Sequence, residues 1–320
     1  MRDNFLKLYS EPLALALVLE ASAYPKPGNV HRLRDRKGLR YEAFLATGIL
    51  STKYFEKGIK RGYYGERQLK VLIGDLVFGL LRDVIYKLRS TNTCLGSSLI
   101  LSVMSVSLGK LLRFEDKNVE SLREITRSVV EKTTVFDSIY YYKAIRLASP
   151  SYIKPSDNTG EYVNVWDENF DSKLLEKGHR LVDILRYSSK FDVVSDEVLN
   201  GFQRGLEAEK FLRLRLRSHG DLNRAIVESY LYLLSENKDT IVYIKHGENV
   251  SNEISQKARR ILGEVMKNNS NWFNYLWEFD NELYNKGINP GAVADLTAET
   301  IALFLLRNIL EEGVLLDLSY

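Results

Sequence analysis

Apolar positions recur every three or four residues along most of the chain, which is the period of a helix with one buried face. Short polar or glycine-containing breaks separate these segments. Only two segments, 162–166 and 240–244, alternate and are rich in β-branched residues, as strands are. We therefore predict an all-α protein with about twelve helices, placed at roughly 11–24, 41–60, 66–89, 93–113, 117–132, 135–148, 172–188, 193–217, 221–236, 249–267, 271–287 and 291–312.

One long stretch, residues 149–171, lacks this periodicity. It contains Pro150, Pro155 and Gly160 and is either a seam between domains or a functional flap. The helices predicted on both sides of it are equally apolar. We therefore predict a single multi-helix domain over residues 1–320 that carries 149–171 as a long irregular loop.

The composition of the chain limits the kinds of molecule that it is expected to bind. The chain has 320 residues, is 45% hydrophobic and carries a net charge of only +3. It can bury a large core, but it lacks the strong positive field of a dedicated nucleic-acid binder. A local basic cluster is present at Arg32, Arg34, Arg36, Lys37 and Arg40. We predict small phosphorylated ligands and no nucleic acid as partners, and the oligomeric state stays open.

Cysteines and apolar runs indicate the compartment. Cys94 is the single cysteine, so a disulfide framework is excluded, and the four histidines have no zinc-binding spacing. The longest apolar run, 99–108, is far shorter than the about 20 residues that span a bilayer, and no signal-peptide pattern follows Met1. We predict a cytoplasmic protein that does not enter the membrane.

The helix predicted from Leu13 to Tyr24 is apolar on every side except at Glu20. An unpaired carboxylate in a core is strongly destabilising, so we expect Glu20 to face a polar cavity. The loop that follows has the features of an anion site. Its prolines end the helix, Gly28 lets backbone approach a ligand, and positive charge comes from Lys26, His31 and Arg32.

A second candidate is the turn 91–98, which opens the next apolar helix. Its hydroxyl and amide side chains are good N-caps. The simpler interpretation is a capped core helix, and the alternative is a phosphate site at the helix N-terminus. Within that helix a stripe of small residues should let another helix approach closely, at Ser98, Ser102, Ser105 and Gly109.

A third candidate precedes the last helix, where Asn289-Pro290-Gly291 leads into an apolar segment. Asp295 and Glu299 lie one turn apart on one face among alanines. Such a pair could hold Mg²⁺ together with waters and substrate phosphates. The alternative is that Asp295 favours the helix N-terminus and Glu299 is solvated.

Other polar residues have simpler interpretations. Capping explains Asp239 most economically, and Arg213 and Arg217 share a solvated helix face. The remaining histidines have no spacing that suggests ligation.

These features occur in a recognisable order. Glu20 is followed by PKPG, then come an Asn-Thr turn with Gly96, Asp239-Thr240 with a later glycine, and NPG leading into ADLTA. In this order the chain resembles the triphosphoribosyl-dephospho-CoA synthase family, especially its archaeal branch. The matching segments are PGNVHRLRD near the start, YEAFLATGI at 41–49, FDVVSDEVLNGF at 191–202, DLNRAI at 221–226 and NPGAVADLTAET at 289–300.

The resemblance implies an all-α enzyme that joins ATP to the ribose 2′-hydroxyl of 3′-dephospho-CoA and releases adenine. The product is a precursor of the prosthetic group of citrate or malonate lyase systems. Carboxylates near the sugar and Mg²⁺ on the triphosphate would serve this substitution.

The resemblance also implies roles for particular residues. Glu20 and Asp295 are candidate base or metal carboxylates, with Glu299 as a further metal candidate. The candidate nucleotide contacts are Lys26, Gly28, Asn29, His31, Arg32, Asn92, Thr93, Gly96, Asp239, Asn289 and Gly291. A single site requires Glu20, Lys26, Asn92 and Asp295 to line one pocket, with Glu299 facing inward.

Two departures separate this chain from the well-characterised branch. That branch reads Asn-Thr-His-Lys-Gly where this chain has Cys94 and Leu95, and it has Asp where this chain has His31. These changes suggest a rearranged anion site or a different acceptor. Two alternatives therefore remain: an enzyme on the same scaffold with another phosphorylated acceptor, and a non-catalytic nucleotide-binding or helical interaction protein.

Overall fold

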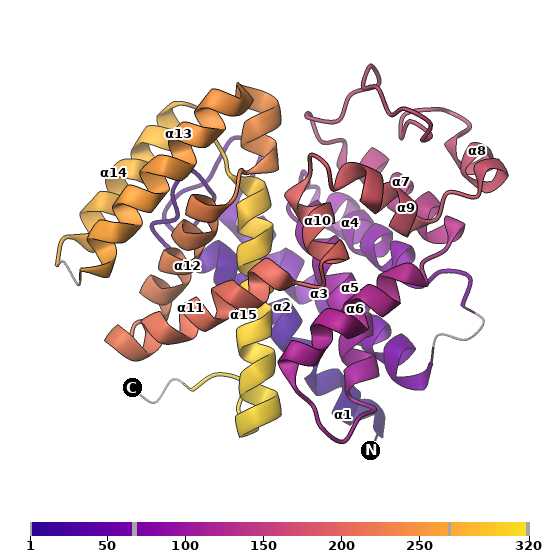
Figure 1. The fold of residues 1–320 in the computed structure, drawn as a ribbon, viewed down its shortest axis with the longest axis horizontal. Coiled ribbons are helices and arrows are strands. Elements are labelled where there is room, and N and C mark those ends of the chain that lie inside the picture. Colours follow the sequence, from indigo (N-terminus) through magenta and orange to yellow (C-terminus); the bar gives the residue numbers. More distant parts are fainter. Residues whose placement is uncertain (1, 66–68, 268–269, 318–320) are drawn as a thin grey trace.

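The computed structural model describes residues 2–65, 69–267 and 270–317, and over these residues it is all-α (Figure 1). Within them the only β features are two isolated bridges, His31 with Arg34 and Arg36 with Leu39. The helices are α1 Arg2–Leu8, α2 Glu11–Ser22, α3 Tyr41–Tyr64, α4 Gly74–Leu88, α5 Leu95–Leu111, the 3-10 turn η1 Val119–Ser121, α6 Leu122–Glu131, α7 Val135–Ala148, α8 Phe170–Lys177, α9 Leu181–Ser188, α10 Val193–Leu199, α11 Gln203–His219, α12 Leu222–Glu236, α13 Thr240–Met266, α14 Trp272–Asn285 and α15 Gly291–Glu312.

The last helix, α15, stands in the middle of the molecule (Figure 1, yellow). It packs against α2 and α5 from the first half of the chain and against α11 and α12 from the second half. Its side chains from Leu296 to Leu306 are almost all buried, which explains why this helix is apolar on every side. Helix α2 is equally apolar because it is enclosed between α3 and α15.

The predicted stripe of small residues on α5 makes the expected close helix contact. A Cβ added to Gly58 of α3 would lie 1.9 Å from Ser105 Oγ, and one added to Gly62 would lie 2.0 Å from Val106 O. Gly109 is equally tight, because its Cβ would lie 2.0 Å from Ile59 O. Only glycines let the two backbones pass at this distance, so α3 and α5 form a rigid wall.

Several predicted segments differ from the structure. The helix predicted at 172–188 is divided into α8 and α9, and the one at 193–217 into α10 and α11, because Gly178 and Gly201 adopt positive φ at +68° and +70°. The strand-like segment 240–244 is helical and forms the start of α13, which kinks at Gly247. Residues 162–166 are irregular rather than extended into a strand. Helix α1 was not predicted, and positions 66–68 of the helix predicted at 66–89 lie outside the described residues.

Of the stretch predicted as a long irregular loop, residues 149–169 form a loop over α7 and α9, while 170–171 begin α8. Tyr142 Oη donates to Val163 O at 2.7 Å, and Arg146 donates to Val165 O at 2.9 Å. From the other side, Tyr187 Oη donates to Asn158 O at 2.9 Å. Helices α7 and α9 therefore hold this loop, called here the roof loop, in one position.

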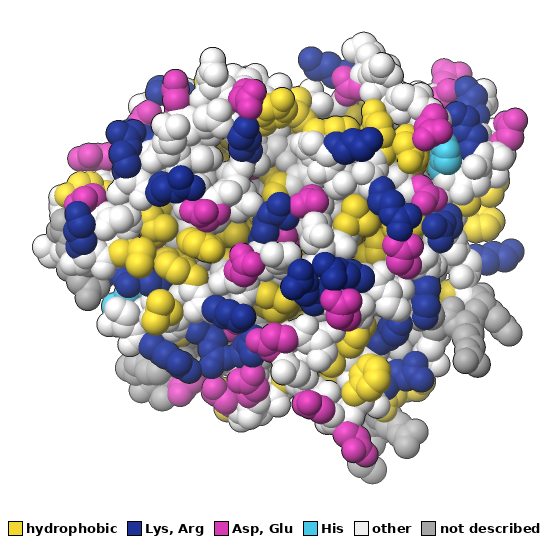
Figure 2. Space-filling model, in the orientation of Figure 1, with side chains coloured by type: hydrophobic (Ala, Val, Ile, Leu, Met, Phe, Trp, Pro, Cys, Tyr) yellow, Lys and Arg dark blue, Asp and Glu magenta, His cyan; other side chains and the backbone are white. Residues whose placement is uncertain are grey.

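On the face shown in Figure 2, Lys and Arg side chains alternate with Asp and Glu and do not gather into a field of one sign. Among the described residues, no helix combines the length and the apolar character needed to cross a bilayer.

Candidate active site

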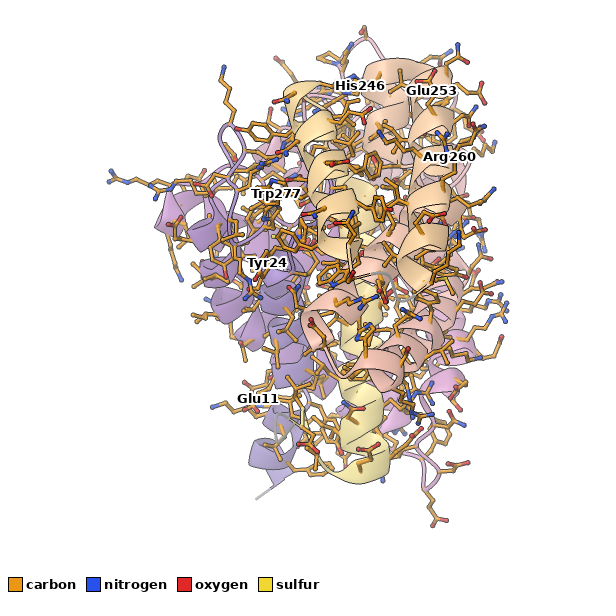
Figure 3. All side chains as sticks on the ribbon, turned by 90° about the vertical axis from the view of Figure 1, so that its left-hand side faces the viewer. Glu11, Tyr24, His246, Glu253, Arg260 and Trp277 are labelled. Carbon is orange, nitrogen blue, oxygen red and sulfur yellow. The ribbon has the colours of Figure 1, made fainter. Side chains whose placement is uncertain are left out.

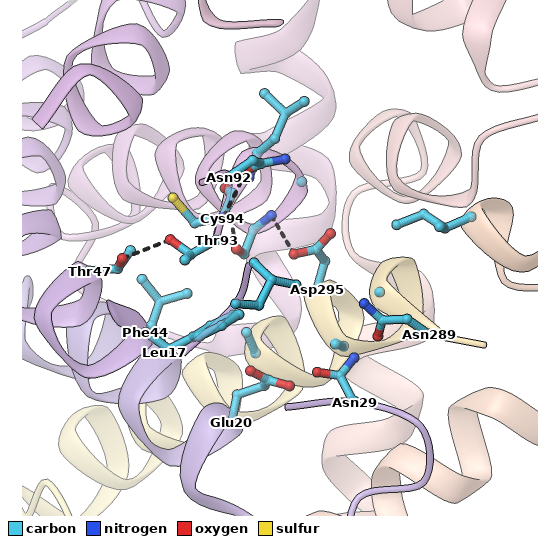
Figure 4. A pocket seen from close by; sticks show the side chains of 18 of the residues that line it. Leu17, Glu20, Asn29, Phe44, Thr47, Asn92, Thr93, Cys94, Asn289 and Asp295 are labelled. Atoms are coloured by element: carbon cyan, nitrogen blue, oxygen red, sulfur yellow. Dashed lines mark hydrogen bonds between the residues drawn. The ribbon is translucent and has the colours of Figure 1, made fainter. Parts of the chain in front are cut away.

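A pocket of about 110 Å³ lies where the N-terminal ends of α5 and α15 meet the C-terminal end of α2 (Figure 4). We call it the site pocket. Its polar lining residues come from three distant parts of the sequence: Glu20 and Asn29, then Thr47 and the turn 92–97, and finally Asn289 and Asp295. Three predicted residues, Glu20, Asn92 and Asp295, therefore do line one pocket, although Glu20 and Asp295 are 275 positions apart (295 − 20).

Glu20 faces the pocket but is not unpaired. Its carboxylate forms an ion pair with the Lys26 ammonium, which also donates to Glu20 O at 2.8 Å. Lys26 is fully buried and Glu20 is 6% exposed, so burial raises the pKa of Glu20 and lowers that of Lys26 while the pairing opposes both shifts. Lys26 is not itself among the lining residues, because its ammonium is directed at Glu20. Any effect of Lys26 on a ligand would act through Glu20.

The basic loop after Lys26 is anchored to α14 and does not point into the pocket. Asp280, fully buried on α14, accepts from Gly28 N at 2.9 Å and contacts His31 Nε2 at 3.2 Å. Arg34 joins the same carboxylate at 2.5 Å. Gly28 has φ +75° and packs against Leu283, so its conformational freedom serves this turn and not a ligand.

Arg32 turns outward from this loop. Its Nε donates to Ser22 O at 2.6 Å, and its guanidinium lies 4.5 Å from the ring centre of Tyr24. Figure 3 shows Tyr24 next to Trp277 at the junction of this segment with α14. Gly28, His31 and Arg32 thus lie outside the lining of the site pocket, and the structure gives them a role in holding the loop.

The turn 92–97 is a capped helix start, as the simpler interpretation predicted. Asn92 Oδ1 accepts from Cys94 N at 3.1 Å and Leu95 N at 2.9 Å. Thr93 Oγ1 is 2.8 Å from Thr47 Oγ1 on α3. The chain's own side chains therefore already occupy these backbone donors, so they are not free to bind a phosphate.

Asp295 on α15 accepts a further hydrogen bond from the turn 92–97. Its Oδ1 accepts from Ser97 N at 2.9 Å, and its carboxylate reaches α5 because Gly96 has no side chain. A Cβ on Gly96 would lie 2.1 Å from Asp295 Oδ2. Burial, together with the negative charges of Glu20 and Asp239, raises the pKa of Asp295 to about 8 despite the bond from Ser97. Asp295 is therefore largely protonated at neutral pH.

The segment before α15 supplies amide groups. Asn29 Nδ2 donates to Pro290 O at 3.3 Å, which connects the first loop to the last. Asn289 and Gly291 also line the pocket, and Asn289 Oδ1 is buried without a hydrogen-bond partner among the described residues. A buried carbonyl oxygen of this kind is available to a ligand donor or a cation.

Asp239 and Glu299 lie outside the pocket lining. Asp239 caps two helices, since it accepts from Val242 N at 2.9 Å and from Val293 N at 2.8 Å, and burial raises its pKa to about 6. Glu299 is fully buried one turn beyond Asp295 and packs against Gly205 of α11. Burial and the neighbouring Glu197 carboxylate raise the pKa of Glu299. The predicted Asp295–Glu299 metal pair therefore does not face one cavity.

The sequence profile of the CitG family, ATP:dephospho-CoA triphosphoribosyl transferase, matches residues 7–313. The chain belongs to this family. It is 24% identical to the 2-(5′′-triphosphoribosyl)-3′-dephosphocoenzyme-A synthase of Klebsiella pneumoniae over 297 residues, which cover 89% of this chain and 86% of that protein. A crystal structure described as a triphosphoribosyl-dephospho-CoA synthase from Archaeoglobus fulgidus shares the fold, with a TM-score of 0.61, 22% identity and coverage of 82% of this chain and 97% of that one.

This transferase departs from the well-characterised branch of the family at Cys94 and Leu95 and again at His31, and the two departures lie in different places. Cys94 and Leu95 are in the pocket wall, and burial raises the pKa of the Cys94 thiol to about 12, so it stays protonated and inert. His31 lies at the loop anchor beside Asp280. Only the first departure changes the surface that a ligand would meet.

Sequence reasoning missed the residues that hold this transferase's loop in place. Asn223 of α12 exchanges two hydrogen bonds with the Tyr24 backbone, at 3.0 and 2.7 Å, and Tyr230 Oη donates to Pro27 O at 2.8 Å. Asn223 belongs to the matching segment DLNRAI, so its presence there was a usable signal. Asp280 was detectable as a carboxylate in an aromatic helix opposite a basic cluster.

Proposed function

We propose that this protein transfers the triphosphoribosyl group of ATP to the ribose 2′-hydroxyl of 3′-dephospho-CoA, and that the reacting ribose lies in the site pocket. The observation that carries the proposal is Asp295. It is a carboxyl group with a pKa of about 8 that shares a pocket with the ion-paired Glu20. Two carboxyl groups with different protonation states are what a substitution at an anomeric carbon requires.

In this reaction the bond from C1′ of ATP to adenine N9 breaks and a bond from C1′ to the acceptor oxygen forms. The bond electrons and one proton go to adenine, and the acceptor hydroxyl loses one proton. Asp295, protonated at neutral pH, is the proton donor to the departing base. Glu20, which is ion-paired with Lys26, stabilises positive charge at C1′ and accepts the hydroxyl proton.

The lining of the pocket favours Mg²⁺-bound ATP over free ATP. None of the described residues that line it is Lys or Arg, so a bare triphosphate would meet the Glu20 carboxylate without a cation in the lining. The oxygen atoms available to coordinate the metal are those of Glu20 and Asn289, the ligand type that Mg²⁺ prefers. Among the described residues no cluster of three or more His, Cys, Asp or Glu could hold a metal, so phosphates and water would complete its coordination.

The decisive experiment measures free adenine after incubation with ATP, Mg²⁺ and candidate acceptors. Adenine that appears only with 3′-dephospho-CoA supports the proposal. Adenine that appears only with another phosphorylated acceptor would indicate the same scaffold with a different substrate, for which the change at Cys94 and Leu95 is the specific reason. Tight ATP binding without adenine release would indicate a non-catalytic nucleotide-binding protein. We also propose a cytoplasmic location, in keeping with a chain that has a single cysteine and no disulfide framework.

A further inference from the structure

A second cavity, of about 460 Å³, lies beneath the roof loop and adjoins the site pocket. We call it the roof cavity. The two cavities share lining residues at their junction, which are Leu95, Gly96, Tyr152, Ile241 and Asp295. Asp295 therefore faces both cavities, and a molecule in the roof cavity can place one end at this carboxyl group.

The roof cavity is preformed. Its roof is held by the hydrogen bonds from Tyr142, Arg146 and Tyr187 described above, and Trp166 Nε1 closes the loop on itself by donating to Ile153 O at 3.1 Å. On the opposite side, the first turns of α13 form the wall up to the kink at Gly247. A ligand would enter without first ordering the loop, which lowers the entropic cost of binding.

The walls suit a long, mostly apolar ligand with a few polar groups. Tyr142, Ile145, Ile184 and Val194 give apolar surface, while Ser195 and Thr240 supply hydroxyl groups. The volume lies within the range of about 300 to 1,000 Å³ that drug-sized ligands occupy, whereas the site pocket is well below that range.

The roof cavity meets charges of both signs, with Asp157 and Asp192 in its lining beside two lysines. Lys154 is in its lining, and the Lys245 ammonium is 5.9 Å from the ring centre of Tyr152 at the junction. Both lysines are exposed, unlike Lys26. An acceptor that carries phosphate would meet these two cations, and the site pocket offers none among its described lining residues.

We infer that the roof cavity is the acceptor subsite and that it takes the pantetheine arm of 3′-dephospho-CoA. The inference rests on the proposed function. The reaction brings two substrates to one carboxyl group, and the roof cavity is the larger and more apolar of the two spaces that meet at Asp295. Residues of the roof loop and of α13 before Gly247 thereby select the acceptor.

Ile244 allows a test that leaves the site pocket intact. Its side chain lines the roof cavity and is 41% exposed, so a larger side chain can be accommodated without disturbing the core. Ile244→Trp should raise the KM for 3′-dephospho-CoA about tenfold and leave the KM for ATP within about twofold. The matched control is Tyr243→Trp, because Tyr243 is 40% exposed on the same helix turn but does not line either cavity.

A second measurement needs no variant. Free pantetheine, which lacks the reacting ribose, should inhibit the wild-type enzyme competitively against 3′-dephospho-CoA and not against ATP. A rise in the KM for ATP alone in Ile244→Trp would overturn the inference and assign the cavity to the adenine of ATP. Unchanged constants for both substrates, or no inhibition by pantetheine, would also overturn it. If wild-type protein releases no adenine with 3′-dephospho-CoA, the proposed function itself fails.

Discussion

At the scale of single residues, the ion pair of Glu20 and Lys26 combines a structural and a chemical task. A lysine with 0% exposure is destabilising unless it is paired, and Glu20 together with the carbonyl oxygen of the same residue supplies that pairing. The pair also keeps one negative charge at the pocket wall. Removing Lys26 therefore leaves the Glu20 carboxylate buried without its ionic partner.

We expect Lys26→Met to lower the free energy of unfolding by about 3 to 5 kcal/mol, the range for breaking a buried pair by removing one partner. The double variant Lys26→Met/Glu20→Gln should be less destabilised, because no lone charge stays buried. Chemical denaturation measures both variants. Arg40→Ala, which breaks a pair with an arginine side chain 75% exposed, is the control and should change stability by less than about 1 kcal/mol. A Lys26→Met protein as stable as wild type would contradict this account.

The raised pKa of Asp295 predicts how the free energy of unfolding depends on pH. Its pKa is raised from 3.8 to about 8 in the folded protein, so the folded form keeps a proton that the unfolded chain releases near pH 4. The stability that this group contributes is complete below pH 4 and is lost as pH rises towards 8. Asp295→Asn should therefore flatten the fall in unfolding free energy between pH 5 and 8, measured with urea at several pH values.

The proton on Asp295 should also determine how the activity depends on pH. If Asp295 donates it to adenine, kcat/KM should fall as pH rises through about 8. Asp295→Asn keeps the shape and the acceptor for Ser97 N but should lose adenine release. An active Asp295→Asn enzyme with the wild-type alkaline limb would remove Asp295 from the chemistry.

At the scale of elements, the N-terminal end of α5 can approach Asp295 closely because Gly96 has no side chain. Gly96→Ala should disrupt the contact with Asp295, because the new Cβ would lie 2.1 Å from Asp295 Oδ2. We expect activity to fall at least about tenfold, with a loss of stability of about 1 to 3 kcal/mol from overpacking. Adenine release and thermal unfolding measure the two effects.

Gly263→Ala is the matched control for this variant. Gly263 also lies within a helix, and a Cβ there would meet nothing within 4 Å. It should be neutral in activity and more stable by about 0.5 to 1 kcal/mol, because alanine favours the helix. Equal behaviour of the two variants would mean that the close contact at Gly96 does not position Asp295.

The positions of most helices could be predicted from the sequence because their apolar faces are continuous. The breaks within the predicted helices could not be predicted from the sequence. Gly201 and Phe202, with φ +70° and +66°, divide one predicted helix into α10 and α11 through a backbone conformation that periodicity does not reveal. The segment 240–244 is helical because Asp239 caps it and its apolar residues cover the roof cavity, both of which are tertiary circumstances. Local pattern alone favoured a strand there.

At the scale of the whole molecule, the sequence predicted that Glu20, Asn92 and Asp295 share a pocket but not which basic residues would reach it. The reason is Asp280, which lies 252 residues from Gly28 and binds the loop that carries His31 and Arg34. A basic loop can serve an anionic ligand or an internal carboxylate, and only the three-dimensional arrangement decides between the two.

Ligand binding should act on all parts of this arrangement together. We expect ATP with Mg²⁺ to slow amide hydrogen exchange around Asn29 and at 92–98 and 289–296 at once, because each of these three segments contributes residues to one pocket. The outer half of α13, at 253–266, lines neither cavity and is the internal control. Protection confined to one of the three segments would show that the ligand does not bridge them.

The central position of α15 also affects how the protein is made. Helix α2 is synthesised early and is apolar on every side except at Glu20, but one of the helices that enclose it, α15, is the last of the described helices to be synthesised. Such long-range contacts slow folding and leave apolar surface exposed in the meantime. The site pocket therefore cannot form until α15, which carries Asp295, has been translated.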